Sequence, residues 1–342
     1  MARIAPLFEG PLDLIGDIHG EIDALRDLLA RLGYGPDGVH PEGRRLVFVG
    51  DLCDRGPDSP AVVALVADLV AAGHAQCVLG NHELNLIRGS RKEGNGWFFE
   101  DDHDRTDGKF LTSNSASARV REEVMAFFET LPVALESPGL RVVHACWLGE
   151  AIDRVRSHRD EDPASHFEHW ERELNACLLA DGTIDAARAE LAEHGASLRN
   201  PNALIPMLPN TAALDQARQM ANPLRVLTSG VERATAVPFY TSGKWRVVER
   251  VAWWNEYDSD VPVVIGHYWR WPVSIDRAAF GKAGPDLFAG APYDEPLGLR
   301  KNVYCIDYSV GRRFQERLRG GAFQTRLGAL RWPERQLVFD GL

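Results

Sequence analysis

Three short apolar runs, each followed directly by glycine and a polar residue, limit what this chain can fold into. The runs cover residues 12–15, 46–49 and 77–79 and have the composition of buried β-strands. The segments that follow them read GDIHG, GDLCDRG and GNHE. Helical patterns at residues 22–32 and 60–72 follow the first two runs, which predicts an α/β fold with parallel pairing. The polar segments would then gather at the carboxyl ends of neighbouring strands.

These segments contain side chains that bind divalent metal ions. Asp17 and His19 lie two residues apart on one loop and can face a single ion. Asp51 follows the next strand and can bridge two ions, and Asn81 offers a neutral oxygen to the second ion. Carboxylate and amide oxygens suit hard ions, while imidazole extends the choice to manganese, iron or zinc. The pattern predicts a metal site with room for chemistry.

Two histidines farther along the chain are candidates for the remaining ligands. His144 follows the strand-like run Arg-Val-Val at 141–143, and His267 follows the run 263–265 and Gly266. Either histidine alone could be a core residue with satisfied hydrogen bonds, and GDIHG alone could cap a helix. The order and spacing of all the segments favour a metal site.

The residues beside these ligands fit the hydrolysis of phosphate esters. Two metal ions about 3.5–4 Å apart hold a phosphoryl oxygen and activate water near neutral pH. Arg55 can hold two phosphoryl oxygens, and His82 is placed to protonate the leaving oxygen. Asp54 can fix the tautomer of that histidine. A metal-bound hydroxide would attack phosphorus directly, without a Ser or Cys nucleophile.

In order, the three segments, His144 and the Gly-His pair ending at His267 resemble the phosphoprotein phosphatase branch of the calcineurin-like metallophosphoesterases. Residues 40–51 and 331–337 are similar to the phosphatase module of bacterial polynucleotide kinase-phosphatase, and residues 94–99 to bacteriophage lambda phosphatase. The chain also resembles the symmetrical diadenosine tetraphosphatases of this superfamily.

The resemblance implies a two-sheet β-sandwich flanked by helices, in four αββα layers, around two divalent ions. Mn²⁺ is the expected ion, with iron, zinc and nickel as alternatives. Asp54 and His82 would form the catalytic pair, and Arg55 would bind phosphate. The implied ligands are Asp17, His19 and Asp51 for one metal, and Asp51, Asn81, His144 and His267 for the other.

The sequence departs from the family pattern in two places. Relatives usually carry a second phosphate-binding arginine before the last metal-binding histidine, and Glu256 stands near that position here. Arg250 or Arg246 could replace it, with Arg250 as our candidate substrate contact. The segment from Ile306 to Ser309 differs from the commoner Ile-Asp-Thr-Gly. The specificity of protein phosphatases therefore does not carry over.

The composition changes after residue 149 and divides the chain into three parts. Residues 150–222 are rich in Ala, Glu and Arg with helical patterns, and β-rich runs return from residue 247 onward. We expect residues 1–149 and 246–342 to form the halves of the metallophosphoesterase core, with the returning runs in a second sheet. Residues 150–245 would form a largely helical cap that restricts substrate entry, or else a support without contact to substrate.

The net charge and the hydropathy of the chain limit its binding to nucleic acids and membranes. A formal net charge of −11 without a sustained basic run argues against tight binding of long nucleic acid. No stretch of about 18 consecutive apolar residues occurs, so we expect no membrane-spanning helix. The five cysteines show no paired spacing, which favours a cytoplasmic protein.

We expect a dinuclear-metal phosphoesterase that hydrolyses phosphate monoesters of small molecules or phosphoproteins. Hydrolysis of dinucleoside polyphosphates or other nucleotides, or of 2′,3′-cyclic phosphates, is the alternative. The aromatic residues near His267, from Trp245 to Trp271, could stack a nucleobase or pack beneath a sheet edge. A metal-binding scaffold without catalysis is a further alternative. A scaffold, however, has no need for Arg55 and His82.

Overall fold

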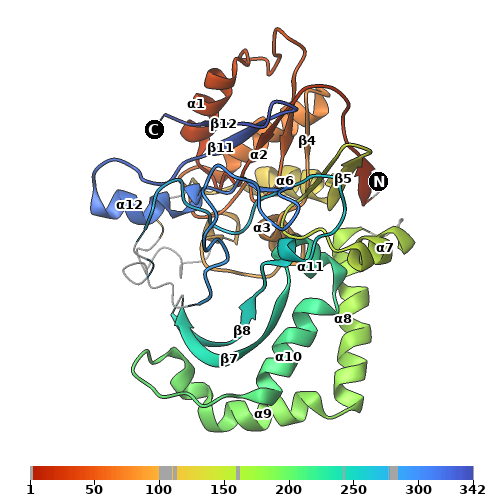
Figure 1. The fold of residues 1–342 in the computed structure, drawn as a ribbon, viewed down its shortest axis with the longest axis vertical. Helices are drawn as coiled ribbons and strands as arrows, with labels where there is room; N and C mark the ends of the chain where they lie inside the picture. The colour runs from red at the N-terminus through yellow and green to blue at the C-terminus, as the bar shows by residue number, and fades with distance from the viewer. Residues whose placement is uncertain are drawn as a thin grey trace.

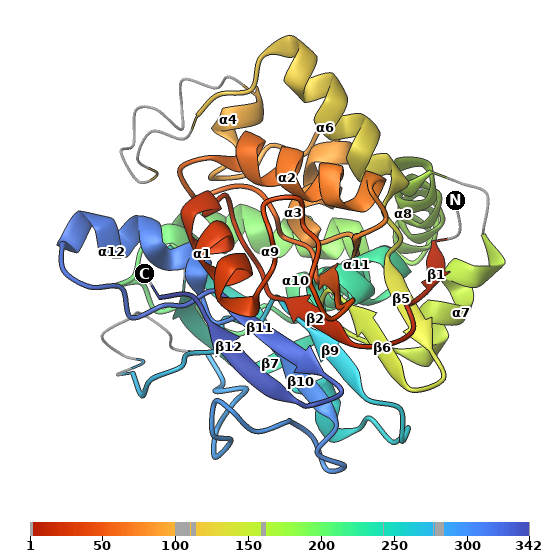
Figure 2. The same cartoon turned by 90° about the horizontal axis from the view of Figure 1, so that it is seen from above.

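Two five-stranded sheets form the centre of the molecule (Figure 2). The computed structural model describes residues 3–99, 110, 114–158, 162–241, 243–275, 277 and 284–341. The first sheet has the order β1-β5-β6-β9-β10 and the second β12-β11-β2-β3-β4. In these orders the strands span Ile4–Pro6, Ala134–Ser137, Leu140–Val143, Val263–Ile265 and Val303–Cys305, and then Gln336–Phe339, Gly328–Trp332, Leu12–Ile15, Arg45–Phe48 and Ala75–Cys77.

The two sheets pack face to face and carry helices on their outer faces. Leu14 of the second sheet and Val264 of the first are fully buried in one apolar cluster between the sheets. Helices α1 (Ile22–Leu32) and α2 (Ser59–Ala71) contact β12 and β4 of the second sheet, and α7 (Gly149–Ser157) contacts β1 of the first. These layers confirm the predicted sandwich.

Local sequence accounts for helix α1, which begins and ends where its periodicity predicts. Its buried residues recur every three or four positions along one face. Gly33 ends the helix with a φ of 97°, a left-handed conformation that glycine adopts without steric cost. Helix α2 starts after Asp58, whose carboxylate accepts a hydrogen bond from the backbone N–H of Ala61.

The strands that return after the insertion do not form a sheet of their own, which corrects our expectation. Strand β9 pairs in parallel with β6 in the first sheet, whereas β11 pairs antiparallel with β2 in the second. Both β2 and β6 would otherwise present an open hydrogen-bonding edge, which a further strand covers. The C-terminal segment therefore completes both sheets.

The insertion contains strands as well as helices. Helix α10 (Pro209–Met220) packs against a curved hairpin of β7 (Glu232–Thr241) and β8 (Lys244–Arg250), and α8 (Pro163–Ala180) and α9 (Thr183–His194) pack against α10 (Figure 1). The helices bury a small apolar cluster of their own. The boundary expected between residues 245 and 246 falls inside β8.

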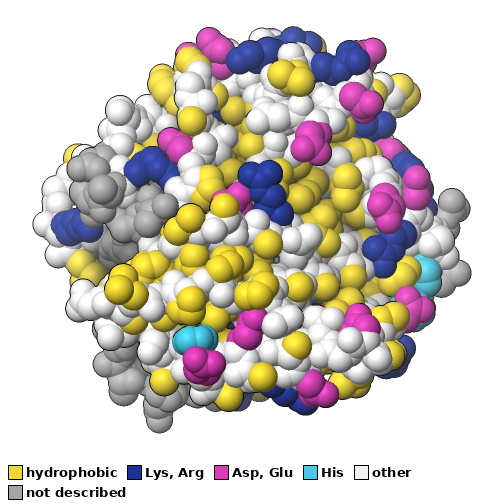
Figure 3. All heavy atoms as spheres, turned by 60° about the horizontal axis from the view of Figure 1, so that its bottom comes forward, with side chains coloured by type: hydrophobic (Ala, Val, Ile, Leu, Met, Phe, Trp, Pro, Cys, Tyr) yellow, Lys and Arg dark blue, Asp and Glu magenta, His cyan; other side chains and the backbone are white. Residues whose placement is uncertain are grey.

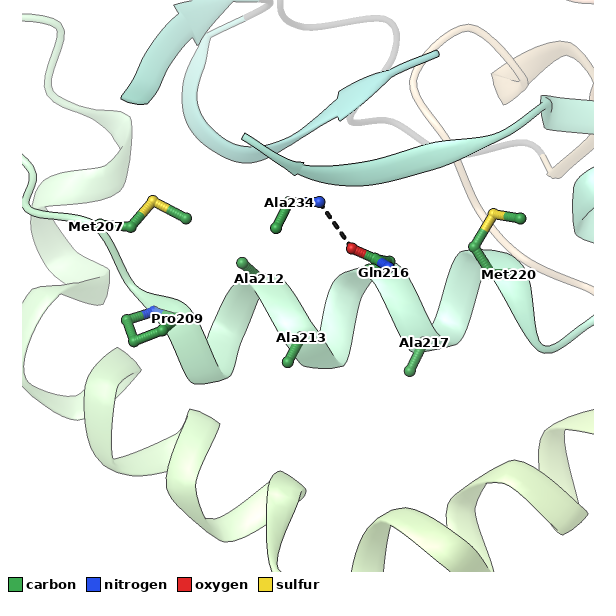
Figure 4. A pocket seen from close by; sticks show the side chains of 8 residues that line it. All are labelled: Met207, Pro209, Ala212, Ala213, Gln216, Ala217, Met220 and Ala234. Atoms are coloured by element: carbon green, nitrogen blue, oxygen red, sulfur yellow. Dashed lines mark hydrogen bonds between the residues drawn. The ribbon is translucent and has the colours of Figure 1, made fainter. Parts of the chain in front are cut away.

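A pocket of about 370 Å³ lies between α10 and β7 (Figure 4). Most of its lining is Ala, Met and Pro, and Gln216 Oε1 there accepts a hydrogen bond from the backbone N–H of Ala234. On the face of the molecule in Figure 3, hydrophobic side chains cover much of the surface between scattered charges. None of the residues that line the pocket is charged, so the pocket holds no acid, base or metal-binding carboxylate.

Among the described residues, no helix is both long and apolar enough to cross a bilayer. The remaining helices are α3 (Asn81–Ile87), α4 (Gly96–Phe99), α6 (Ala118–Thr130), α11 (Pro223–Ser229) and α12 (Arg313–Arg319), with 3-10 helices η1 (Gly195–Arg199), η2 (Trp253–Asn255) and η3 (Val310–Arg312).

Candidate metal centre

The predicted metal ligands lie at the carboxyl ends of strands from both sheets. Asp17 and Asp51 follow β2 and β3, and Asn81 begins α3 after β4, all in the second sheet. His144 and His267 follow β6 and β9 in the first sheet. The site therefore spans the seam between the sheets, at the strand ends where α/β folds usually bind ligands.

Asp51 lies in the middle of the site. Its Oδ2 is 3.7 Å from His19 Nε2, 3.9 Å from His82 Nε2 and 3.3 Å from His144 Nε2. Two buried groups of potential ligands share this carboxylate. One group adds His19 and His82, and the other adds His144 and His267. Such sharing suits a carboxylate that bridges two ions.

Asp17 and Asn81 complete the set of predicted ligands. Asp17 Oδ2 is 4.0 Å from His19 Nε2 and accepts a hydrogen bond of 3.0 Å from the backbone N–H of His267. Asn81 Oδ1 lies 3.2 Å from His144 Nε2 and 2.9 Å from His267 Nδ1. The structure thus brings together all six side chains that the sequence proposes as ligands.

Close packing in the site depends on Gly266. A Cβ at this position would lie 1.9 Å from Asp17 Oδ1, so a larger residue would displace the carboxylate. Asp51 and His267 adopt φ values of 51° and 70°, a region that non-glycine residues enter at an energetic cost. Strain of this kind concentrates at functional sites.

Backbone carbonyls orient two of the histidines. His19 Nδ1 lies 3.1 Å from the carbonyl oxygen of Cys53, and His144 Nδ1 lies 2.7 Å from that of Val49. A carbonyl oxygen can only accept a hydrogen bond, so each Nδ1–H donates and each Nε2 faces the site. Histidines that bind metals are commonly held in this way.

The charges of the site favour a bound cation. Burial and the charges of Asp307 and Asp51 raise the pKa of Asp17 well above its usual value. Burial opposes protonation of His144, but the charges of Asp51 and Asp17 outweigh it and raise its pKa to about 10. His267 Nε2 is buried without a hydrogen-bond partner among the described residues. Divalent cations would neutralise the carboxylates and occupy ring nitrogens, so the residues fit the predicted metals.

A second group of side chains adjoins these ligands. His82 Nδ1 lies 2.5 Å from Asp54 Oδ2, and Trp97 Nε1–H donates to Asp54 Oδ1 at 2.6 Å. The guanidinium of Arg55 lies 2.9 Å from both His19 Nε2 and His82 Nε2. Asp54 thus holds the imidazole with one oxygen while the indole fixes the other. The geometry suits an acid at His82 and an anion-binding group at Arg55.

A protein-family model agrees with this geometry. Residues 10–270, which include all six presumed ligands, match the model for the calcineurin-like phosphoesterases. The chain belongs to this family. Its members are phosphoric ester hydrolases, the reaction class that the sequence predicts.

Curated proteins with sequences similar to this chain include asymmetrical bis(5′-nucleosyl)-tetraphosphatases named PrpE. That of Bacillus subtilis is 37% identical over 139 residues, which cover 39% of this chain and 56% of the relative. That of Oceanobacillus iheyensis is 33% identical over 138 residues, which cover 39% of this chain and 54% of the relative. The chain therefore spans just over half the length of these relatives.

Solved structures are more distant. A putative diadenosine tetraphosphatase is 16% identical, with a TM-score of 0.43, and the alignment covers 99% of this chain and 97% of the other. A cold-active protein-tyrosine phosphatase of Shewanella is 13% identical, with a TM-score of 0.45 and coverage of 99% and 82%. Neither likeness adds to the argument for this phosphoesterase.

Glu83 is a buried residue of the site to which the sequence analysis gave no role. Its carboxylate accepts hydrogen bonds from the backbone N–H groups of Gly80, Asp51 and Leu52, at 3.0, 2.9 and 2.8 Å. These bonds fix two ligand-bearing loops relative to each other. Its position in the GNHE segment, two residues after Asn81, was the feature of the sequence that could have indicated a role in the site.

Asp307 and Trp97 were also missed as parts of the site. The Asp307 carboxylate accepts hydrogen bonds from the backbone N–H groups of Trp269 at 2.6 Å and Ser309 at 2.8 Å. The unusual sequence of residues 306–309 was the feature that could have pointed to Asp307. Trp97 lies in the stretch 94–99 that resembles lambda phosphatase, but its contact with Asp54 crosses 43 residues of sequence.

Arg250, the predicted substrate contact, lies on the His267 side of the site. Its guanidinium is 5.9 Å from the centre of the Tyr268 ring. Burial and the charge of Arg250 lower the pKa of His267 well below its usual value. Arg246 lies on the same face of β8, four residues earlier. Glu256 is exposed.

Most of the aromatic residues around His267 belong to the apolar interior. Trp269 is the exception near the site, because it is partly exposed and its ring lies 6.4 Å from that of His19. The buried ones are Trp253, Trp254, Tyr257, Tyr268 and Trp271.

Proposed function

We propose that this protein hydrolyses bis(5′-nucleosyl) tetraphosphates and related dinucleoside polyphosphates with the help of divalent metal ions. One observation carries the proposal: buried potential metal ligands surround Asp51, and Arg55 and the His82–Asp54 pair lie beside them. The names of the PrpE relatives favour this substrate over the phosphate monoesters that the sequence analysis put first.

The residues that would hold two ions have the donors that Mn²⁺ prefers, and we propose Mn²⁺ as the ion. Bound ions activate water at neutral pH and offset the negative charge of the phosphate. The ligands would be Asp17, His19 and Asp51 for one ion, and Asp51, Asn81, His144 and His267 for the other.

The other side chains of the site bind the substrate and move a proton. Arg55 holds non-bridging oxygens of the phosphate that is attacked, and Arg250 reaches the substrate from the His267 side. His82 Nε2, which faces Arg55 Nη2 at 2.9 Å here, would donate a proton to the leaving oxygen once Arg55 has turned to the phosphate. Asp54 accepts a hydrogen bond from Nδ1–H of this ring, which fixes the tautomer and the orientation of the ring.

Steady-state kinetics with Mn²⁺ test the proposal. We expect kcat/KM for diadenosine tetraphosphate to exceed that for p-nitrophenyl phosphate by at least about 100-fold, since binding energy from the nucleosides adds to catalysis. His82→Ala should lower kcat by about 10²–10⁴-fold and leave the metal content unchanged. ATP and AMP as products indicate asymmetrical cleavage, and two ADP indicate symmetrical cleavage.

Two results would contradict the proposal. A preference for p-nitrophenyl phosphate would return the phosphate monoesters to first place. Tight metal binding without turnover of either substrate would favour the non-catalytic scaffold.

A further inference from the structure

The 3-10 helix η3 packs directly against the metal centre. A Cβ at Gly311 would lie 2.3 Å from His19 Cδ2 and 3.1 Å from Arg55 Nη1. The backbone at this position therefore touches both a presumed ligand and the presumed phosphate clamp. The next residue, Arg312, is on the His19 side of the site, whereas Arg250 is on the His267 side. Arg312 is buried, and its Nη2 donates a hydrogen bond to Gln315 Oε1 at 2.6 Å, a bond for which phosphate oxygens would compete.

The guanidinium of Arg312 lies over two indole rings. It is 5.9 Å from the centre of the Trp269 ring and 5.5 Å from that of Trp271. The guanidinium of Arg55 lies over the same Trp269 ring at 4.6 Å. Trp269 thus supports two arginine heads, and flat indole faces hold planar guanidinium groups well.

The backbone keeps Trp269 in this place at an energetic cost. Its φ is 56°, in the left-handed region that bulky residues avoid. Asp307 stabilises this conformation, because its carboxylate accepts the N–H of Trp269 at 2.6 Å and its carbonyl accepts the N–H of Arg270 at 2.9 Å. A strained backbone conformation that hydrogen bonds hold in place beside a candidate catalytic centre points to a functional use of Trp269.

We propose that Arg312, positioned by Trp269, binds phosphate groups of the substrate beyond the one that is attacked. The inference rests on the proposed function, because only a polyphosphate chain has such groups. A chain held at its attacked phosphate by Arg55 extends along the Trp269 ring to Arg312. A guanidinium there makes paired, charge-assisted hydrogen bonds to phosphate oxygens.

Binding to a His82→Ala background tests the inference separately from turnover. The Mn²⁺-loaded protein is titrated calorimetrically with diadenosine tetraphosphate and with AMP. We expect Arg312→Gln to weaken binding of the tetraphosphate by about tenfold or more and that of AMP by less than about twofold. Arg312→Lys should recover part of the loss, because the charge remains. Trp269→Leu should show the same difference between the ligands, and Trp269→Phe a smaller one.

The matched control is Arg335→Gln. Arg335 also lies over an indole, at 5.4 Å from the Trp332 ring centre, but it is exposed and sits in the turn between β11 and β12. This control should bind both ligands as the parent does.

Three outcomes would overturn the inference: equal weakening of both ligands by Arg312→Gln, no weakening of either, or no binding of the tetraphosphate to the parent. Failure of the wild-type enzyme to hydrolyse dinucleoside polyphosphates, with the ligand difference intact, would instead reject the proposed function and keep the subsite.

Discussion

At the scale of single residues, the site is built from carboxylates with different duties. Asp51 and Asp17 are proposed metal ligands, whereas Glu83 and Asp307 accept backbone hydrogen bonds that fix the loops. Each carboxylate is buried, so each must be matched by donors or cations. Loss of any one of them should therefore have a specific signature.

Glu83→Gln should loosen the loops that hold the ligands. Glutamine keeps one acceptor oxygen and replaces the other with an NH₂ group. This group cannot accept a hydrogen bond from a backbone N–H, so at least one of the three hydrogen bonds is lost. We expect the free energy of unfolding to fall by about 2 kcal/mol, with weaker Mn²⁺ binding. Denaturant titration and metal analysis measure both. Glu122→Gln, at an exposed helical position, is the control, and equal effects in the two variants would refute the role of Glu83.

Trp97→Phe should affect catalysis and leave the metals in place. The variant keeps the aromatic packing and removes the N–H that fixes Asp54 Oδ1, so His82 is less well oriented. We expect kcat to fall by about 3–10-fold at unchanged metal content. Steady-state kinetics on the same substrate decide this, with Trp332→Phe as control. A loss of metal would show that Trp97 supports the ligands instead.

At the scale of secondary-structure elements, helix α8 contains a histidine that burial keeps neutral. Neither ring nitrogen of His166 has a hydrogen-bond partner among the described residues. The ring of His158 stacks on it at 5.4 Å. Burial, together with the charges of His158, His169, Arg3 and Arg154, lowers the pKa of His166 to about 4.

The stability of the protein should consequently fall in acid. The folded state binds a proton on His166 less readily than the unfolded chain, whose histidines have a pKa of about 6.5. Stability from this group is complete above about pH 6.5 and is lost as the pH falls toward 4. Between pH 7 and pH 5, wild type should lose about 2 kcal/mol more than His166→Phe. Denaturant titrations at both pH values measure the difference, and parallel losses would contradict it.

Prediction of the elements succeeded where local patterns decide the outcome. The apolar periodicity of residues 22–32 gave the bounds of α1, and the motif order gave the positions of the ligands at strand ends. The hairpin β7–β8 was missed inside a segment whose composition is mostly helical. The pairing of β9 with β6 and of β11 with β2 was also missed, because partners distant in sequence are chosen by burial and not by local propensity.

At the scale of the whole molecule, the metal centre links the two sheets. Asp17, Asp51 and Asn81 belong to one sheet and His144 and His267 to the other. Ions bound between them would favour the arrangement in which the sheets are docked. Stability should therefore depend on metal.

Removal of the metals should lower the melting temperature. An ion present at 100 times its dissociation constant stabilises the folded state by about 2.7 kcal/mol, so chelation followed by return of Mn²⁺ should lower and then restore the melting temperature. Asp51→Asn removes the shared ligand and should respond weakly to Mn²⁺. Calorimetric scans with and without the ion measure this. An equal response of the variant would argue against a bridging Asp51.

The distribution of the ligands also affects when the protein becomes active during synthesis. The backbone N–H of His267 and the carboxylate of Asp17 that accepts its hydrogen bond are 250 residues apart, and β2 acquires its antiparallel partner β11 later still. A ribosome that has released the first three motifs has produced four of the six proposed ligands, and His144 and His267 are still missing. The nascent chain would thus lack the full set of proposed ligands until His267 has been translated, and β2 would lack its antiparallel partner until β11 has followed.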